Sequence, residues 1–154
     1  MCLKLIIYME QTKIETLAKA LDNLKKSLAF LNKILIKHSD KLELFELVTA
    51  SASMLHHVEI AFDFAIKVIK SVIDKDTTIN VPIYSTKDLL KVAETSRLIN
   101  SHNHWIDFYN ARVNCSKIYD NDDEIMEIYQ SIKMFVIYLE SLIYKLEKLV
   151  VVEE

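Results

Sequence analysis

Residues 125–149 read IMEIYQSIKMFVIYLESLIYKLEKL, and apolar side chains recur through them at intervals of three and four. This spacing places one apolar stripe along a helix and is typical of helices that pack into bundles. Residues 14–35 and 48–72 show the same spacing. The stripe positions are Ile14, Leu17, Leu21, Leu24, Leu28, Leu31 and Leu35; Val48, Ser51, Leu55, Val58, Phe62, Ala65, Ile69 and Val72; and Ile125, Ile128, Ile132, Phe135, Leu139, Leu142, Leu146 and Leu149. The sequence therefore predicts three long helices.

The composition supports a purely helical protein. None of the 154 residues is glycine, and the single proline is Pro82. Glycine is the usual residue where the backbone must turn sharply or approach a phosphate closely. Phosphate-binding loops, dinucleotide fingerprints and nucleophile elbows all depend on it. Any chemistry in this chain is therefore expected to come from side chains that project from helices.

Shorter elements are expected between the second and third stripes. Residues 74–84 contain Asp, Thr, Asn and the proline, and they predict a loop. Ser85 can cap a short helix, with Asp88 three residues later in a capping-box position. Ser101 can begin another helix, and the acidic residues 120–124 suit the start of the last one because a helix N-terminus favours negative charge.

These elements predict an all-α fold, an up-and-down four-helix bundle with one short additional helix, as a single domain over residues 1–154. The hydrophobic content of 51% is enough for a core, and the net charge of −3 argues against general nucleic-acid binding. No apolar run has membrane length, and we expect no membrane association. Cys2 and Cys115 lie far apart and are expected to be free thiols in the cytoplasm. Translation is expected to start at Met1 or Met9.

We expect no metal site, cofactor or catalytic residue. His56 and Glu59 are three residues apart and could share a helix face, but a di-metal bundle needs a second such pair, which the sequence lacks. Cys115 has no histidine beside it on a helix face to lower its pKa. The acidic residues near 122 lack the alternating ligands and the glycine of a calcium-binding loop.

Residues 105–120, WIDFYNARVNCSKIYD, are the strongest candidate for a binding site. Arg112, Ser116 and Tyr119 are spaced by four and three residues and are expected on one helix face, with Asp120 at its end. A polar stripe is usually only a solvated face, but this one has aromatic neighbours. They are Trp105, Phe108 and Tyr109. The combination favours a binding or interface role.

In this segment the chain resembles the nucleotidyltransferase substrate-binding proteins, helical partners of minimal nucleotidyltransferases within the wider HEPN group. Their signature is an Arg, usually followed by Asn, and then Ser-His-x-Tyr-Asp; this chain reads RVNCSKIYD over residues 112–120. A second block, HHVEIAFDFAIKVIK over residues 56–70, matches a helix with Phe, Glu and aromatic residues that ends in Lys. The matching positions there are Glu59, Phe62, Asp63, Ala65, Lys67 and Lys70. The resemblance covers about residues 10–150.

The resemblance implies a bundle similar to the C-terminal domain of kanamycin nucleotidyltransferase, a homodimer, and a non-catalytic subunit that completes the substrate cleft of a separate nucleotidyltransferase. Arg112 would hold a phosphate or a carboxylate through its planar guanidinium. Trp105 and Tyr109 would stack on a flat substrate. The residues implied for the cleft are Arg112, Ser116, Lys117, Tyr119, Trp105, Tyr109, Asp120 and Glu59.

Two alternatives follow from the same residues. Some similar proteins are ribonuclease toxins that act on RNA, with the nucleotidyltransferase as antitoxin. Their motif places His where this chain has Lys117, and a lysine of ordinary pKa is a poor general base near neutral pH. A ribonuclease with this degenerate motif is the second hypothesis. The third is a helical interaction protein whose cleft has decayed.

Overall fold

The computed structural model describes residues 3–37, 44–76, 78–114 and 122–152. Within these ranges the chain forms helices joined by short loops, and no strand is present. The helices are α1 (Leu3–Lys37), α2 (Leu44–Lys75), α3 (Thr86–Thr95), α4 (His102–Asn114) and α5 (Asp122–Val152). The predicted all-α bundle is confirmed. No helix of the described residues has the length and apolar character needed to cross a membrane.

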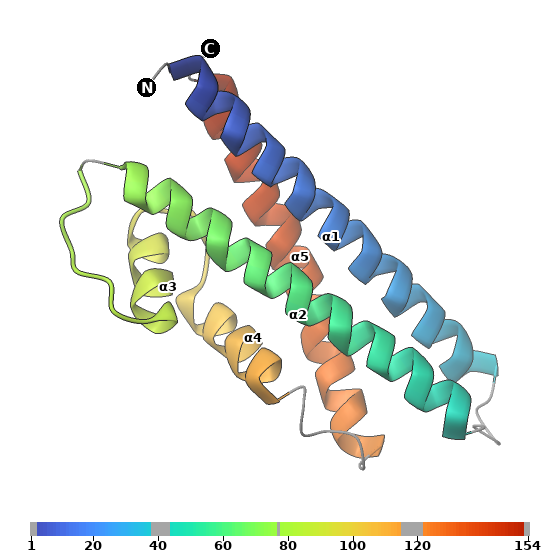
Figure 1. Cartoon of the computed structure of the whole chain (residues 1–154). Coiled ribbons are helices and arrows are strands. Elements are labelled where there is room, and N and C mark those ends of the chain that lie inside the picture. The colour runs from blue at the N-terminus through green and yellow to red at the C-terminus, as the bar shows by residue number, and fades with distance from the viewer. Residues whose placement is uncertain (1–2, 38–43, 77, 115–121, 153–154) are drawn as a thin grey trace.

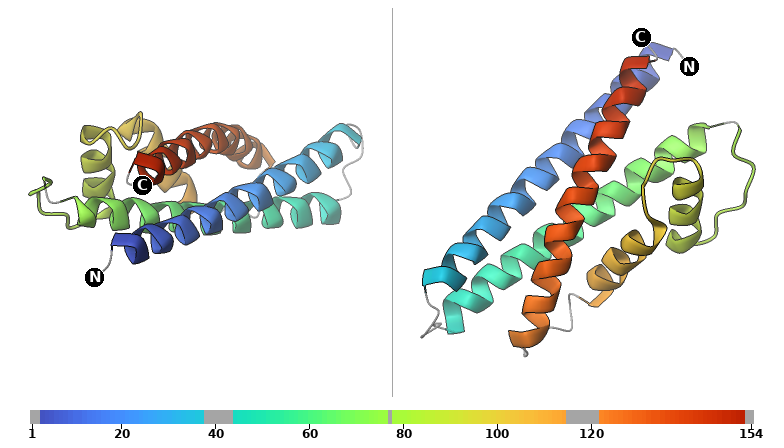
Figure 2. Two further views of the ribbon diagram at one scale, coloured as in Figure 1. Left: turned by 90° about the horizontal axis from the view of Figure 1, so that it is seen from above. Right: turned by 180° about the vertical axis from the view of Figure 1, so that it is seen from behind.

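The helices follow an up-and-down path (Figure 1). The long helices α1 and α2 form an antiparallel hairpin, and α5 runs back antiparallel to α1. The shorter α4 is the fourth bundle member; it packs on α2 and α5, on the side away from α1 (Figure 2). The additional helix α3 packs against α2 and α4. The candidate functional site lies on the α2–α4 side.

The predicted apolar stripes form the core of the bundle. Leu17, Leu24 and Leu31 of α1 are fully buried, as are Ala65 and Ile69 of α2. The fully buried stripe residues of α5 are Ile132, Phe135, Leu139, Leu142 and Leu146. Most of each stripe therefore faces the interior, as its spacing predicts.

Two ends of the predicted stripes lie outside the core. Val48 near the start of α2 and Leu149 near the end of α5 are exposed. Both stripes repeat every seven residues, and a straight helix turns by roughly 20° relative to each such repeat. Over several repeats the terminal positions rotate away from the core, and the stripe prediction was wrong at these two residues.

An aromatic cluster joins α4 to α2 and α5. The indole ring of Trp105 meets the ring of Phe135 edge-on, with 5.8 Å between centroids, and lies 6.3 Å from the ring of Phe62. The ring of Phe108 lies 5.2 Å from that of Phe135 and 5.5 Å from that of Tyr138. These separations are typical of favourable aromatic pairs. The cluster fixes the position of α4 in the bundle.

The predicted starts of the short helices are confirmed. The backbone N–H of Asp88 donates to Ser85 Oγ over 3.2 Å, and the carboxylate of Asp88 accepts from the backbone N–H of Tyr84. Before α4, Ser101 Oγ accepts from the backbone N–H of His104. The bonds to Ser85 and Ser101 satisfy backbone N–H groups of the first helical turn that have no partner within the helix.

A side-chain turn follows α2. Asp76 accepts hydrogen bonds from the backbone N–H and the Oγ1 of Thr78, at 2.9 and 2.6 Å. Both bonds stabilise the ionised carboxylate, and they lower the pKa of Asp76 below its usual value. Asp76 therefore initiates the loop between α2 and α3 in the manner typical of aspartate in turns.

Arg97 ends α3 in a conformation that favours glycine. Its φ is 63°, in the left-handed region. The N–H of Leu98 donates to the carbonyl of Ala93 and the N–H of Arg97 to that of Glu94, both over 2.9 Å. This pattern is a Schellman motif, in which glycine usually takes the left-handed position. A chain without glycine fills that position with a residue that pays a steric cost.

Arg97→Gly is therefore expected to raise the free energy of unfolding by about 0.5–1 kcal/mol, because glycine adopts a positive φ without steric strain. Urea denaturation followed by circular dichroism measures the change. Lys91→Gly, at an exposed position inside α3, is the matched control and is expected to lower stability by about 1 kcal/mol. Equal losses in both variants would contradict the assignment of strain to Arg97.

Candidate functional site

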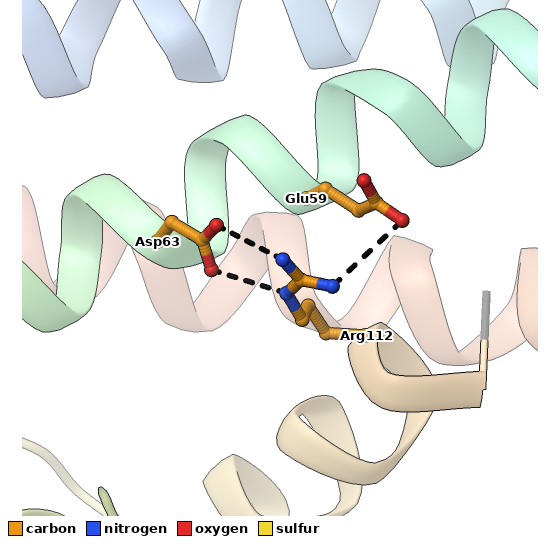
Figure 3. A network of polar contacts seen from close by, with 3 residues as sticks. All are labelled: Glu59, Asp63 and Arg112. Carbon is orange, nitrogen blue, oxygen red and sulfur yellow. Dashed lines mark hydrogen bonds and ion pairs between the residues drawn. The ribbon is translucent and has the colours of Figure 1, made fainter. Parts of the chain in front are cut away.

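Arg112, in the last turn of α4, reaches across to α2 and pairs with Asp63 (Figure 3). Its Nε donates to Asp63 Oδ1 and its Nη2 to Asp63 Oδ2, each over 3.1 Å. Two parallel bonds between one guanidinium edge and one carboxylate form a bidentate pair, the strongest geometry for this combination. The pair links two helices at positions 49 residues apart in the sequence.

Glu59 completes a group of three charged residues, which we call the carboxylate–arginine triad: Glu59, Asp63 and Arg112. The Oε1 of Glu59 lies 3.8 Å from Arg112 Nη1, a looser contact than those of Asp63. The side chains are 34% exposed for Glu59, 50% for Asp63 and 32% for Arg112. With all three ionised, the triad carries one net negative charge and remains accessible to solvent.

Packing of α4 explains why Arg112 points at α2. Trp105, Phe108 and Arg112 are spaced by three and four residues and share one face of the helix. The first two are buried in the aromatic cluster, where Trp105 contacts Phe62 of α2. The same face therefore brings Arg112 beside α2, next to the residue that follows Phe62, which is Asp63. The apolar contacts position the ionic ones.

The structure brings together two of the residues that the sequence assigned to the cleft, Glu59 and Arg112. Tyr109 lies close by in the chain; it is half-buried, with its ring 6.2 Å from that of Phe62. The fourth predicted residue within the described part, Trp105, is 1% exposed. Its ring packs on protein side chains, so it takes a core position in place of the ligand-stacking position expected from the sequence.

The other predicted cleft residues lie outside the described residues. They are Ser116, Lys117, Tyr119 and Asp120. Their alignment with Arg112 on one helix face, and any role of Lys117 in RNA cleavage, stay predictions. The described part of α4 ends at Asn114, two residues after Arg112.

Asp63 was not among the residues predicted for the cleft, although it lies in the second block that resembles the family. The available signal was its spacing from Glu59. Four residues separate the two carboxylates, which places both on one face of α2. Spacing along one helix does not indicate which other helix packs opposite that face.

Three histidines of the described helices, His56, His57 and His104, make ring contacts with neighbouring side chains. The rings of His56 and His57 meet edge-on, 5.5 Å apart. His104 stacks on Tyr138, with 4.8 Å between centroids, and its Nδ1 lies 2.7 Å from Ser101 Oγ. A group of three or more His, Cys, Asp or Glu side chains able to hold a metal ion is not found within the described residues.

The chain matches the model of a known protein family. The family described as nucleotidyltransferase substrate binding protein like matches residues 19–148. Among solved structures, the chain is similar to HI0074 of Haemophilus influenzae, whose structure is described as revealing the fold of a substrate-binding domain of a nucleotidyltransferase. The identity is 23% and the TM-score 0.59, over 82% of this chain and 98% of HI0074. No curated protein sequence matches the chain.

The bidentate contact predicts a measurable coupling between Arg112 and Asp63. In a double-mutant cycle with Arg112→Gln and Asp63→Asn, we expect a coupling free energy of about 0.5–1 kcal/mol, held down by solvent screening of the half-exposed carboxylate. Urea unfolding of the four proteins measures it. A parallel cycle with Glu59→Gln is expected to give a smaller value, since that contact is longer. A larger coupling for Glu59 than for Asp63 would contradict the observed geometry.

Proposed function

This chain belongs to the family of nucleotidyltransferase substrate-binding-like proteins, and on that premise we propose that it is the non-catalytic, substrate-binding subunit of a two-component nucleotidyltransferase. A separate partner subunit supplies the catalytic groups, and this chain completes the substrate cleft in the cytoplasm. The observation that carries the proposal is the carboxylate–arginine triad between α2 and α4.

Three properties of the triad support a binding role. Its charged groups come from two helices and are held on a rigid scaffold, because the adjoining aromatic cluster is buried. Its members are 32–50% exposed, which leaves them within reach of a ligand. A guanidinium fork matches the geometry of carboxylates and phosphates, the anionic groups that nucleotides and many acceptor substrates carry.

The chain around the triad extends the proposed cleft. Tyr109, one turn before Arg112, is half-buried and offers an aromatic side chain beside the charged group. We assign Tyr109 the contact with a flat or apolar part of the substrate. Ser116, Lys117, Tyr119 and Asp120 follow α4 in the sequence and, in this proposal, line the same cleft as Arg112.

We also propose that the chain forms a homodimer through α5. Met134, Ile137 and Tyr144 are exposed apolar side chains of this helix. Their spacing of three and seven residues places them on one face. A second copy of the chain that packs against this face would bury apolar side chains that solvent otherwise covers, which is the usual driving force of a symmetric interface.

Affinity purification of the tagged chain from its native host tests the partnering. We expect a short nucleotidyltransferase to co-purify, recognisable in mass spectrometry by Gly-Ser and Asp-x-Asp motifs. Arg112→Glu is expected to reduce its recovery at least about fivefold if the triad borders the shared cleft. Lys19→Glu, the same charge change at an exposed position of α1, is the control and is expected to have no effect. Recovery of no nucleotidyltransferase with the unmodified chain would refute the partnering.

Light scattering after size-exclusion chromatography tests the homodimer. The expected mass is about 36 kDa, twice the 17.9 kDa of one chain. Ile137→Glu is expected to give the single-chain mass, because a charge on the proposed face would be buried without a partner. Phe45→Glu replaces an exposed apolar residue at the start of α2 and should leave the mass unchanged. Loss of the dimer in the Phe45 variant alone would place the interface elsewhere.

A further inference from the structure

The fork of Arg112 is already occupied in the free chain, and this occupation suggests how the site is controlled. We propose that Asp63 takes the position on Arg112 that an anionic group of the ligand would take, so that the free chain holds its own anion site closed. The inference rests on the proposed function insofar as that function makes Arg112 a ligand contact. It adds an autoinhibitory role for Asp63.

The hydrogen bonds of Arg112 support this proposal. The edge of a guanidinium that presents Nε and one Nη is an edge that carboxylates and phosphates use for bidentate binding. On Arg112 this edge, Nε and Nη2, donates both bonds to Asp63 at 3.1 Å. The remaining nitrogen, Nη1, faces Glu59 at 3.8 Å. An incoming anion therefore meets a carboxylate at each guanidinium nitrogen and must displace Asp63 to form the bidentate contact.

The net charge of the triad also opposes the binding of an anion. The triad has two carboxylates and one guanidinium, and its net charge of −1 repels an anion. Replacing Asp63 by Asn brings the net charge of the triad to zero and removes one of the two oxygens that accept from the bidentate edge. Neutralising Glu59 changes the charge equally but leaves that edge occupied. The two single substitutions thus separate the effect of charge from the effect of occupation.

The solvent exposure of the Arg112–Asp63 pair makes it possible for an anion to replace Asp63. An ion pair sealed in the interior resists opening, since each partner would be left buried and uncompensated. Here the Asp63 side chain is 50% exposed and that of Arg112 is 32% exposed. Water can solvate the released carboxylate, so the pair lowers the affinity for an incoming anion by a factor of up to about five and does not block its binding altogether.

A titration of the purified full chain with inorganic pyrophosphate at low ionic strength tests the proposal. Binding is followed by calorimetry and by the NMR signal of the Arg112 Nε–H, which reports directly on the bond to Asp63. We expect Asp63→Asn to bind pyrophosphate about three to five times more tightly than the unmodified chain. Glu59→Gln is expected to give a smaller gain, and the double variant the largest. Adding Arg112→Gln to Asp63→Asn should remove the gain.

Asp107→Asn is the matched control. Asp107 is an exposed acidic residue of α4, the helix that carries Arg112, and Asp107→Asn changes the net charge of the chain by as much as Asp63→Asn does. Its affinity for pyrophosphate is expected to stay within about twofold of the unmodified chain. An equal gain in the Asp63 and Asp107 variants, a gain that survives Arg112→Gln, or no binding by any variant would overturn the proposal. Because no partner protein is present, these outcomes are independent of the co-purification result.

Discussion

Burial of aromatic side chains holds α4 against α2 and α5, and the position of the candidate site depends on this packing. A helix of 13 residues is marginal in water on its own, because helix nucleation is costly. Trp105 and Phe108 are its only buried residues, and both contact Phe135 of α5. Aromatic pairs of this kind contribute about 0.5–1.5 kcal/mol each beyond their buried area. A few rings therefore determine where Arg112 lies.

The absence of glycine shapes the connections as strongly as the aromatic rings shape the core. The turn from α3 into the α3–α4 loop needs a left-handed residue, and Arg97 supplies it at a steric cost. The two hydrogen bonds of the Schellman motif and burial of Leu98 and Ile99 offset that cost. This loop sets the direction in which α4 leaves α3. The strained residue Arg97 therefore lies in the turn that positions α4, the helix that carries Arg112, in the bundle.

The sequence predicted the helices better than it predicted their contacts. Periodic spacing identified the buried face of each long helix, and Ser85 and Ser101 marked two helix starts, because these signals are local. The pairing of Asp63 with Arg112 joins positions 49 residues apart, and no spacing rule relates them. Burial of Trp105 was missed for a related reason. An aromatic residue beside a polar stripe looks the same in sequence whether its ring meets a ligand or the core.

Different interactions hold the two ends of α4. The interactions at its start stabilise the fold, and the ion pair at its end lies at the proposed anion-binding site. The first half is anchored by Trp105 and Phe108, whose apolar burial is insensitive to small anions. None of the residues of α4 after Phe108 is buried, and Arg112 links that end of the helix to α2 through a partly solvated ion pair. Ion pairs of this exposure respond to salt, to charge substitutions and to competing ligands. A ligand that exchanges with Asp63 can therefore act on the last turn of α4, where the chain leads on to residues 115–121, while the aromatic cluster keeps the rest of the helix in place.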